Sequence, residues 1–355
     1  AFDMPARLAA RHDVLRSQRW PTDLVRAAEA GDHAGSGASG NRMALQSPKL
    51  TLDHNATSRM SASCLSLASR ISDEAGATVG HGVVAFDMPA RLAARHDVLR
   101  SQRWPADLVR VAEAADMPHG ADAFSGVVYE HGRAVMPAVL LQHLLDGVEH
   151  LTGFDVISIA LGDGDLEIVA RDGRIETVDG VVLALGGDIG LCLERLGHAM
   201  PMELTYGMVS QVPSVGAMSR LDAGLSFGGY LTPALDGRHD LGATFWKDQV
   251  PEGSLEGLTA GHDHNLALLP EPLQRSFPSA AEGLGARMSR RASLPDRRPL
   301  SGRLSEGLFV FGGLGARGFT LGPLLGDLLA AEILARPAPL PRDQLAGIEP
   351  LRYAG

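Results

Sequence analysis

The sequence predicts an α/β fold with a second, mainly antiparallel β domain, and three observations support this prediction. The run "VVLALGG" (181–187) is continuously apolar, as expected of a parallel strand buried on both faces over Val181 to Leu185. The segment from Gly307 to Leu334 has the pattern of a short strand, a glycine-rich turn and a helix. Residues 202–246 instead alternate strand-like runs with glycine turns, which is typical of an antiparallel sheet.

The remaining elements complete this fold in chain order. A polar helix is expected from about Asp53, followed by strands at "ATVGHGVV" and "SGVVYEHGRAV". Apolar residues at helical spacing predict a helix that begins at Pro137. Two strands joined by a turn at Asp172 and Gly173 lead into "VVLALGG". A helix at "DHNLALLPEPLQRSF" connects the antiparallel segment to the closing strand.

One segment occurs twice in the sequence. Ala1–Ala30 returns as Ala85–Ala114 with only two differences. Solenoid repeats diverge and come in runs of three or more, so two near-identical copies indicate a recent duplication or an error in the gene model. Each copy has the pattern of a pair of helices separated by Trp-Pro. The second copy lies inside a continuous pattern of elements, and we therefore interpret Ala1–Ala30 as a duplicated segment of doubtful origin.

Composition excludes several classes of protein. A chain of 355 residues is long enough for about two domains, and its formal net charge of −10 argues against a generally basic nucleic-acid-binding protein. Cys64 and Cys192 match no metal or redox spacing, so reduced thiols in a cytoplasmic protein are expected. No apolar run is long enough to span a bilayer, and no membrane partner is expected.

Histidines and glycines form further patterns, but each lacks the context that would confirm it. His262 and His264 in "GHDHN" are adjacent on a helix and point apart, so we interpret them as a helix start and expect no metal site. Glycines at 313, 315 and 318 spell the dinucleotide-binding pattern G-x-G-x-x-G, yet no second strand follows them. Glycines at 35, 37 and 40 match it as well, without a preceding strand or a following helix.

The closing strand, turn and helix resemble the end of the FAD-dependent oxidoreductases of the D-amino-acid oxidase and glycine oxidase superfamily. The resemblance covers roughly Gly35 to Leu340, through "GASGN", "VVLALGG", "GGYLTPALDG", "GATF", "RASLPDRRPLSG" and "GLFVFGGLGARGFTLGPLLG". Within that superfamily the chain looks most like the oxidoreductase half of bifunctional tRNA-modifying enzymes. The resemblance implies an FAD-binding Rossmann-like domain of the glutathione-reductase type and an antiparallel substrate domain.

The resemblance also implies which residues bind FAD. They lie in three segments: Ser39, Gly40 and Asn41; Ala184 and Gly186; and Gly312, Gly313, Gly315, Ala316, Arg317, Gly318, Phe319 and Thr320. A helix that starts near Thr320 would direct its positive end at the flavin. Members of the superfamily open with a strand, a G-x-G-x-x-G turn and a helix, and here Ala1–Ala30 occupies that position. The first βαβ unit is therefore expected to be absent.

The substrate site is expected in the stretch "RASLPD". Arg291 matches the arginine that binds a substrate carboxylate in related amine oxidases, because a guanidinium offers two parallel N–H donors. Arg290 is an equally placed rival. Tyr230 and Tyr206 are expected to cover the flavin or donate a hydrogen bond, or else to be packing residues. The surrounding arginines, from Arg287 to Arg303, form either a solvated face or a tRNA contact.

The implied activity is FAD-dependent oxidation of an amine, with the carboxymethylaminomethyl group of a tRNA wobble thiouridine as the substrate. Two alternatives stay open: a small substrate such as glycine, sarcosine or a D-amino acid, and an inactive remnant that binds FAD poorly. The implied partners are tRNA or a small secondary amine, with a methyltransferase domain upstream.

The predicted division of the chain follows from the same resemblance. Residues 31–78, 135–200 and 286–355 are expected to form the FAD-binding domain, and residues 79–134 and 201–285 the substrate domain.

Overall fold

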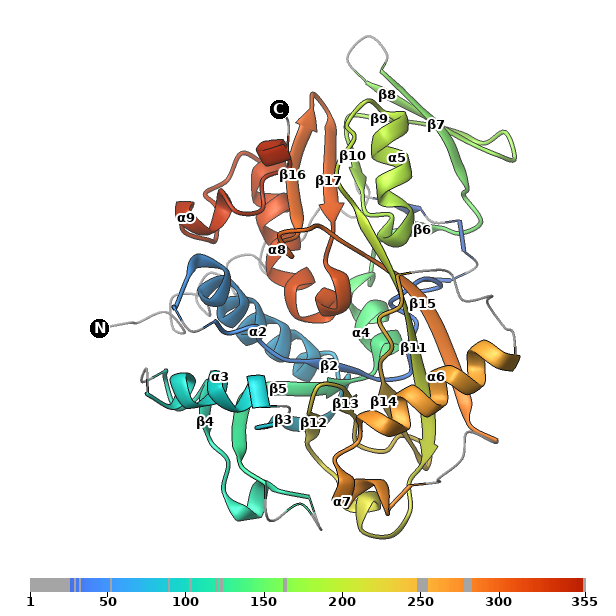
Figure 1. The fold of residues 1–355 in the computed structure, drawn as a ribbon. Helices are drawn as coiled ribbons and strands as arrows, with labels where there is room; N and C mark the ends of the chain where they lie inside the picture. Colours follow the sequence, from blue (N-terminus) through green and yellow to red (C-terminus); the bar gives the residue numbers. More distant parts are fainter. Residues whose placement is uncertain are drawn as a thin grey trace.

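The computed structural model describes residues 26–353 except 29, 32, 52, 89, 102–103, 119–120, 122–123, 162–164, 248–254 and 278–282. Most of the first copy of the duplicated segment therefore lies outside the described residues. Figure 1 shows how the described elements are arranged. No described helix is both long and apolar enough to cross a membrane.

The described helices are α2 (Ala56–Glu74), α3 (Ala90–Ser101), α4 (Pro137–Leu144), α5 (Ile189–Arg195), α6 (Leu255–Leu268), α7 (Glu271–Gln274), α8 (Gly318–Ile333) and α9 (Arg342–Leu345). The short 3-10 turns are η1 (Ala114–Asp116), η2 (Gly186–Asp188), η3 (Gly216–Arg220), η4 (Gly315–Arg317) and η5 (Pro350–Tyr353). The strands are β1 (Arg26–Ala28), β2 (Ala44–Gln46), β3 (Thr78–Phe86), β4 (Val109–Val111), β5 (Gly126–Val135), β6 (Glu149–Leu151), β7 (Val156–Leu161), β8 (Leu166–Ala170), β9 (Ile175–Val178), β10 (Val181–Leu183), β11 (Glu203–Pro213), β12 (Gly224–Ser226), β13 (Tyr230–Leu231), β14 (Arg238–Gly242), β15 (Gly285–Ser293), β16 (Leu300–Ser305) and β17 (Leu308–Gly312).

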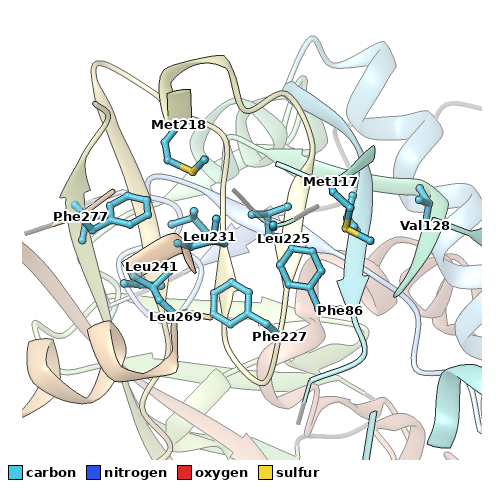
Figure 2. Close-up of a cluster of buried hydrophobic side chains, with 14 residues drawn as sticks. Phe86, Met117, Val128, Met218, Leu225, Phe227, Leu231, Leu241, Leu269 and Phe277 are labelled. Carbon is cyan, nitrogen blue, oxygen red and sulfur yellow. The ribbon is translucent and has the colours of Figure 1, made fainter. Parts of the chain in front are cut away.

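The largest sheet is mainly antiparallel and has the strand order β15-β11-β14-β13-β12-β3-β5-β2, with β4 paired to β5. The run "ELTYGMVSQVP" forms β11 over its full length, as expected, and pairs antiparallel with both β14 and β15. One face of this sheet packs against α6 and α7 over a buried apolar cluster that includes Leu225, Leu241 and Phe277 (Figure 2). The predicted antiparallel sheet is thus confirmed.

The opposite face of this sheet meets the turn between β17 and α8. A β-carbon on Gly315 would lie 3.8 Å from Cβ of Ser293, the last residue of β15. The side chain of Gln46, in β2, donates a hydrogen bond from Nε2 to the Phe319 carbonyl at 2.9 Å. The closing turn and the sheet therefore share an interior surface.

Parallel pairing occurs in three places among the described residues, one of them, β12 with β3, inside the largest sheet. The strand β10 pairs in parallel with β17, as the "VVLALGG" run predicts, and β1 pairs in parallel with β6. The prediction that the "VVLALGG" strand is buried on both faces is wrong, because Val182 is 42% exposed and Leu185, just after the strand, is 41% exposed. Among the described residues β10 has a partner on one side only, so one of its faces and one of its edges stay uncovered.

The helix α2 begins at the expected place and is more buried than its polar sequence suggests. Oδ1 of Asn55 caps it by accepting a hydrogen bond from the Ser58 amide. Its buried face, which includes Met60 and Cys64, packs against α8. Small serine side chains allow this close approach although they contribute little to the apolar character of the helix. The two cysteines are free thiols, Cys64 buried and Cys192 part-buried, as expected.

The duplicated segment does not form a pair of helices in its second copy. Residues Ala90–Ser101 form α3, but the second half of the copy forms the strand β4. The equivalent part of the first copy also forms a strand, β1, which pairs with β6 instead of β5. Val109 is buried in one apolar cluster with Leu99 of α3 and Val127 of β5. This packing outweighs the weak helical preference of the segment.

The histidines of "GHDHN" do not start a helix, as the sequence suggested, because α6 begins earlier, at Leu255. His262 is buried inside α6, and its Nδ1 lies 2.8 Å from Oγ of Ser210 in β11. Within the described part of the chain no group of histidine, cysteine or acidic residues is arranged to hold a metal ion.

Candidate active site

Strand alternation brings a set of polar side chains to the sheet face that meets the closing turn. Paired residues of antiparallel strands point to the same face, and residues two apart along a strand do so as well. In β15 this rule groups Arg287 with Arg291, which pairs with Thr205 of β11. In β13 and β14 it groups Tyr230 with Asp240, because Tyr230 pairs with Gly242.

Arg291 is the most unusual member of this set. It is only 8% exposed, and its Nη1 has no hydrogen-bond partner. Its guanidinium lies directly over Gly207, where a β-carbon would come within 2.3 Å of Cζ. On its other side the ring centroid of Phe245 lies 5.0 Å from Cζ. Burial lowers the pKa of Arg291, and no carboxylate of the described residues forms an ion pair with it.

Tyr230 lies between Arg291 and Asp240 in this set and interacts electrostatically with both. The Tyr230 ring packs on Gly242, where a β-carbon would lie 3.0 Å from its Cε1. Asp240 is 2% exposed; its Oδ2 accepts a hydrogen bond from the Met43 amide at 3.1 Å, and its Oδ1 has no partner. Burial raises the pKa of Tyr230 and of Asp240, and the negative charge of Asp240 raises the pKa of Tyr230 further. Both side chains are therefore expected to be neutral more readily than in water.

Arg290 and Tyr206 belong to the other face of the sheet. They pair with each other across β15 and β11, one position away from Arg291 and Thr205. Arg290 forms an ion pair with Asp188 at 3.0 Å and lines a hollow of about 480 Å³ beside α5. The structure thus separates Arg290 and Tyr206 from the surface that carries Arg291 and Tyr230.

The predicted cofactor turn runs from β17 through η4 into α8. Gly313 and Gly315 have positive φ values of 66° and 57°, which glycine adopts without strain. α8 begins at Gly318, close to the expected start, and the first turn of the helix contains Thr320. Thr320 is buried, and its Oγ1 has no partner. Ala316, Arg317 and Phe319 lie in the same turn, and Gly312 ends β17.

The "GASGN" loop is held against this surface by Arg287. Its Nη2 donates hydrogen bonds to the carbonyls of Ser36 and Gly37, and its Nη1 lies 3.4 Å from Oδ1 of Asn41. A β-carbon on Gly40 would collide with this guanidinium, at 2.4 Å from Nη2. Ser39 lies in the same turn. The loop between residues 36 and 41 is thus fixed by a side chain of the substrate-side sheet.

Ala184 and Gly186 follow β10, in the segment that leads into η2, which contacts β15. Both residues are exposed, and Gly186 has a positive φ of 54°. They lie at the carboxyl end of a parallel strand, which is where ligands bind in α/β sheets. The turn after β17, the "GASGN" loop and Arg291 thus lie around one interior surface, and Ala184 and Gly186 lie beside the start of that turn, because β10 pairs in parallel with β17.

The residues present fit one end of FAD. Near the first turn of α8 two buried polar atoms lack partners, Oγ1 of Thr320 and Oε1 of Gln46, and the helix N-terminus favours negative charge. These groups suit the polar edge of a flavin ring. For the diphosphate, in contrast, the glycines that follow β1 lead into β2 and not into a helix.

Several residues of this surface were not predicted from the sequence. Gly207, Asp240 and Gln46 carry no motif of their own and become visible only when the strands are paired. Phe245 lies in "GATF", a run that the resemblance included without giving its members a role. In a strand, Arg287 and Arg291 lie on one face and Arg290 on the other. This alternation was a signal in the sequence that could have separated Arg291 from Arg290.

Comparison with known proteins agrees with this arrangement. Residues 24–332 match the family model described as FAD dependent oxidoreductase. A tRNA 5-methylaminomethyl-2-thiouridine biosynthesis bifunctional protein of Thiobacillus denitrificans is 32% identical over 346 residues, which is 90% of this chain and 54% of that protein. The protein of the same name from Idiomarina loihiensis is 28% identical, over 93% of this chain and 55% of that protein. The chain thus spans about half the length of these relatives.

Solved structures show the same fold. The glycine oxidase of Geobacillus kaustophilus superposes with a TM-score of 0.67 at 20% identity, covering 88% of this chain and 89% of that chain. An iminodiacetate oxidase from Chelativorans sp. BNC1 gives a TM-score of 0.67 at 21% identity, covering 90% and 92% of the two chains. The family model covers well over half of the chain, and the protein therefore belongs to the family of FAD-dependent oxidoreductases.

Proposed function

We propose that this protein oxidises a secondary amine that carries a carboxymethyl group, and that the natural bearer of this group is a wobble thiouridine of tRNA. The observation that carries the proposal is the buried guanidinium of Arg291, which has an unpartnered Nη1 and no carboxylate partner among the described residues. Burying a cation without a counter-ion is costly, and a substrate carboxylate would relieve that cost.

FAD, when bound, supplies the acceptor for the two electrons removed from the substrate. The protein's part is orientation: Arg291 would hold the carboxylate with two parallel hydrogen bonds, which directs the adjoining carbon toward the turn after β17. Tyr230 would contact the substrate on the side that is nearer to Asp240. The amine loses one hydride from this carbon and one proton from nitrogen, and water then splits the resulting imine into glyoxylate and the free aminomethyl group.

The names of the sequence relatives support tRNA as the substrate, and their greater length is consistent with a second domain such as a methyltransferase. The proposed FAD-binding domain comprises residues 31–78, 135–200 and 286–355, and the proposed substrate domain residues 79–134 and 201–285. A cytoplasmic location is part of the proposal and is supported by the free thiols of Cys64 and Cys192. Tyr206 is not given a role, because it lies on the face opposite Arg291.

Two other functions have specific support. A small amino acid such as glycine or sarcosine would use Arg291 in the same way, and the structural neighbours include a glycine oxidase. An inactive remnant is supported by the uncovered edge of β10 and by the glycines after β1, which lead into a strand and not into a helix.

Product analysis tests these proposals. The chain, supplied with FAD, is incubated separately with tRNA that bears the carboxymethylaminomethyl group, with glycine and with sarcosine. Glyoxylate released from the tRNA alone supports the main proposal. Glyoxylate from glycine or sarcosine, with unchanged tRNA nucleosides, would transfer the function to a small amino acid. No product from any of them, at FAD concentrations far above those that relatives require, would favour the remnant.

A further inference from the structure

The exposure of Phe245 is exceptional for a side chain of its size. At 58% exposed, it is the most exposed large apolar side chain in the described part of the chain. One face of its ring lies over the Arg291 guanidinium, with 5.0 Å between Cζ and the ring centroid. The exposed area therefore lies on the remaining face and edge of the ring, next to the buried guanidinium of Arg291.

Phe245 is mounted on a rigid segment. Its neighbour Thr244 bonds to β11 through Oγ1, which accepts from the Met208 amide at 2.8 Å. Its other neighbour, Trp246, exchanges two backbone hydrogen bonds with Tyr206, at 2.8 and 3.0 Å. The ring is thus presented between two anchors, so a ligand that stacks on it would not have to order a loop first.

Arg291 is in turn confined by Phe245. The guanidinium is enclosed between the backbone at Gly207 and the Phe245 ring, so its free N–H groups point along the plane between them. A carboxylate bound in that plane would lie beside the Phe245 ring and not beneath it. The part of the ligand that follows the carboxylate then emerges at the exposed face of the ring.

We propose that Phe245 is a specificity-determining residue that stacks on the pyrimidine ring of the substrate nucleoside. The inference rests on the proposed function, because it assumes that Arg291 holds the carboxylate of the same molecule. A pyrimidine joined to a carboxylate by a short flexible arm reaches both groups, whereas glycine or sarcosine reaches only Arg291. Base-on-aromatic stacking tolerates any base, so Phe245 selects for a ring and Arg291 for the acid.

Binding of unreactive probes to the full chain tests this proposal. One probe is uridine with a carboxymethoxymethyl group on C5, in which oxygen replaces the amine nitrogen; the other is methoxyacetate, which has the same acid and ether without the base. Their dissociation constants are measured by equilibrium dialysis with excess FAD present. For Phe245→Leu we expect the uridine probe to bind about 5-fold to 150-fold more weakly. Methoxyacetate should change by less than about 2-fold, a difference that lies within a few tenths of a kcal/mol.

Two variants complete the design. Phe245→Trp retains an aromatic face and should bind the uridine probe as well as the unaltered chain. Ile175→Ala, which removes an equally exposed apolar side chain from β9, should leave both constants unchanged. If Phe245→Leu weakens the binding of both probes equally, the ring only confines Arg291. If it leaves the binding of the uridine probe unchanged, Phe245 is not part of the site. Either result overturns the inference. Arg291→Ala distinguishes the underlying function, because probe binding that survives this change contradicts the proposed function itself, whatever Phe245 does.

Discussion

Arg291 is the residue through which the proposed substrate is bound, and its neighbour Arg290 provides a matched control. The two arginines are adjacent in sequence but lie on opposite faces of β15, one buried and unpaired, the other paired with Asp188. Arg291→Ala should lower kcat/KM by a factor that corresponds to about 2–4 kcal/mol of charged hydrogen bonding. Steady-state kinetics on an FAD-loaded enzyme measures this. Normal kinetics in Arg291→Ala together with a loss in Arg290→Ala would transfer the role to Arg290.

Gly207 gives a second prediction about the same guanidinium. A β-carbon at this position would lie 2.3 Å from Cζ of Arg291, so the guanidinium has to move. Gly207→Ala should therefore lower kcat/KM by about 100-fold, the cost of a shift of about 1 Å at a reacting centre, without unfolding the protein. Gly322→Ala is the control, because a β-carbon there meets nothing within 4 Å, and it should stabilise α8 by up to about 1 kcal/mol. Unchanged kcat/KM in Gly207→Ala would show that the guanidinium position is not critical.

Asp327 predicts a pH dependence of stability. Burial on α8 raises its pKa from 3.8 to about 6. The folded chain therefore binds this proton more tightly than the unfolded chain, and the contribution to the free energy of unfolding is fully present below about pH 4. As pH rises to about 6 this contribution is lost, and the free energy of unfolding falls by up to roughly 3 kcal/mol. Urea unfolding at a series of pH values should show this decline and its absence in Asp327→Asn. Asp107→Asn, which changes an exposed carboxylate, is the control and should keep the decline. The same decline in Asp327→Asn would contradict the assignment.

Among the elements, β15 shows what the sequence could and could not reveal. Its arginines were recognised as a group, but whether they formed a solvated face or a site depends on which face of the sheet is covered. The pairing of β15 with β11, a long-range contact, decides this, and single-sequence patterns do not report such contacts. The strands, α4 and the closing turn were predictable because apolar spacing, Pro137 and positive-φ glycines are local signals.

The same limit explains the elements that were predicted wrongly. The "VVLALGG" run has the composition of a doubly buried strand, yet its burial depends on neighbours that the described residues do not include. The end of each duplicated copy forms a strand because a partner strand, β5 or β6, is available to it. Tertiary pairing thus overrides local preference in both cases.

The basic stretch from Arg287 to Arg303 gives a prediction for tRNA binding. Arg287, Arg290 and Arg297 are occupied by the "GASGN" loop, Asp188 and Glu203, which leaves the exposed Arg298 and Arg303 for phosphates. Binding of tRNA should weaken with salt, and Arg298→Ala and Arg303→Ala should each reduce the slope of log affinity against log salt by about 0.7–0.9. Filter binding over a salt series measures the slope. Affinity that does not respond to salt would exclude this stretch as a tRNA contact.

At the scale of the whole molecule, the two parallel pairs outside the largest sheet, β6 with β1 and β10 with β17, do not join among the described residues. A dinucleotide-binding sheet needs a strand and a glycine turn between such pairs to hold the diphosphate. We expect the turn after β17 to face the flavin and Arg291 to hold the substrate, whereas the glycines after β1 lead into a strand and not into a helix. Two or three missing charged contacts at about 1.5–3 kcal/mol each would weaken FAD binding by three or more orders of magnitude.

The absorbance spectrum of the purified protein tests this account most directly, before and after anaerobic addition of a nucleoside that bears the carboxymethylaminomethyl group. The chain of 355 residues should be colourless, and the same chain with a strand–glycine turn–helix unit added upstream of Ala1 should be yellow and should bleach when the nucleoside is added. Near-stoichiometric FAD in the unaltered chain would contradict the account of the cofactor site. A yellow extended chain that glycine bleaches and the nucleoside does not would contradict the account of the substrate.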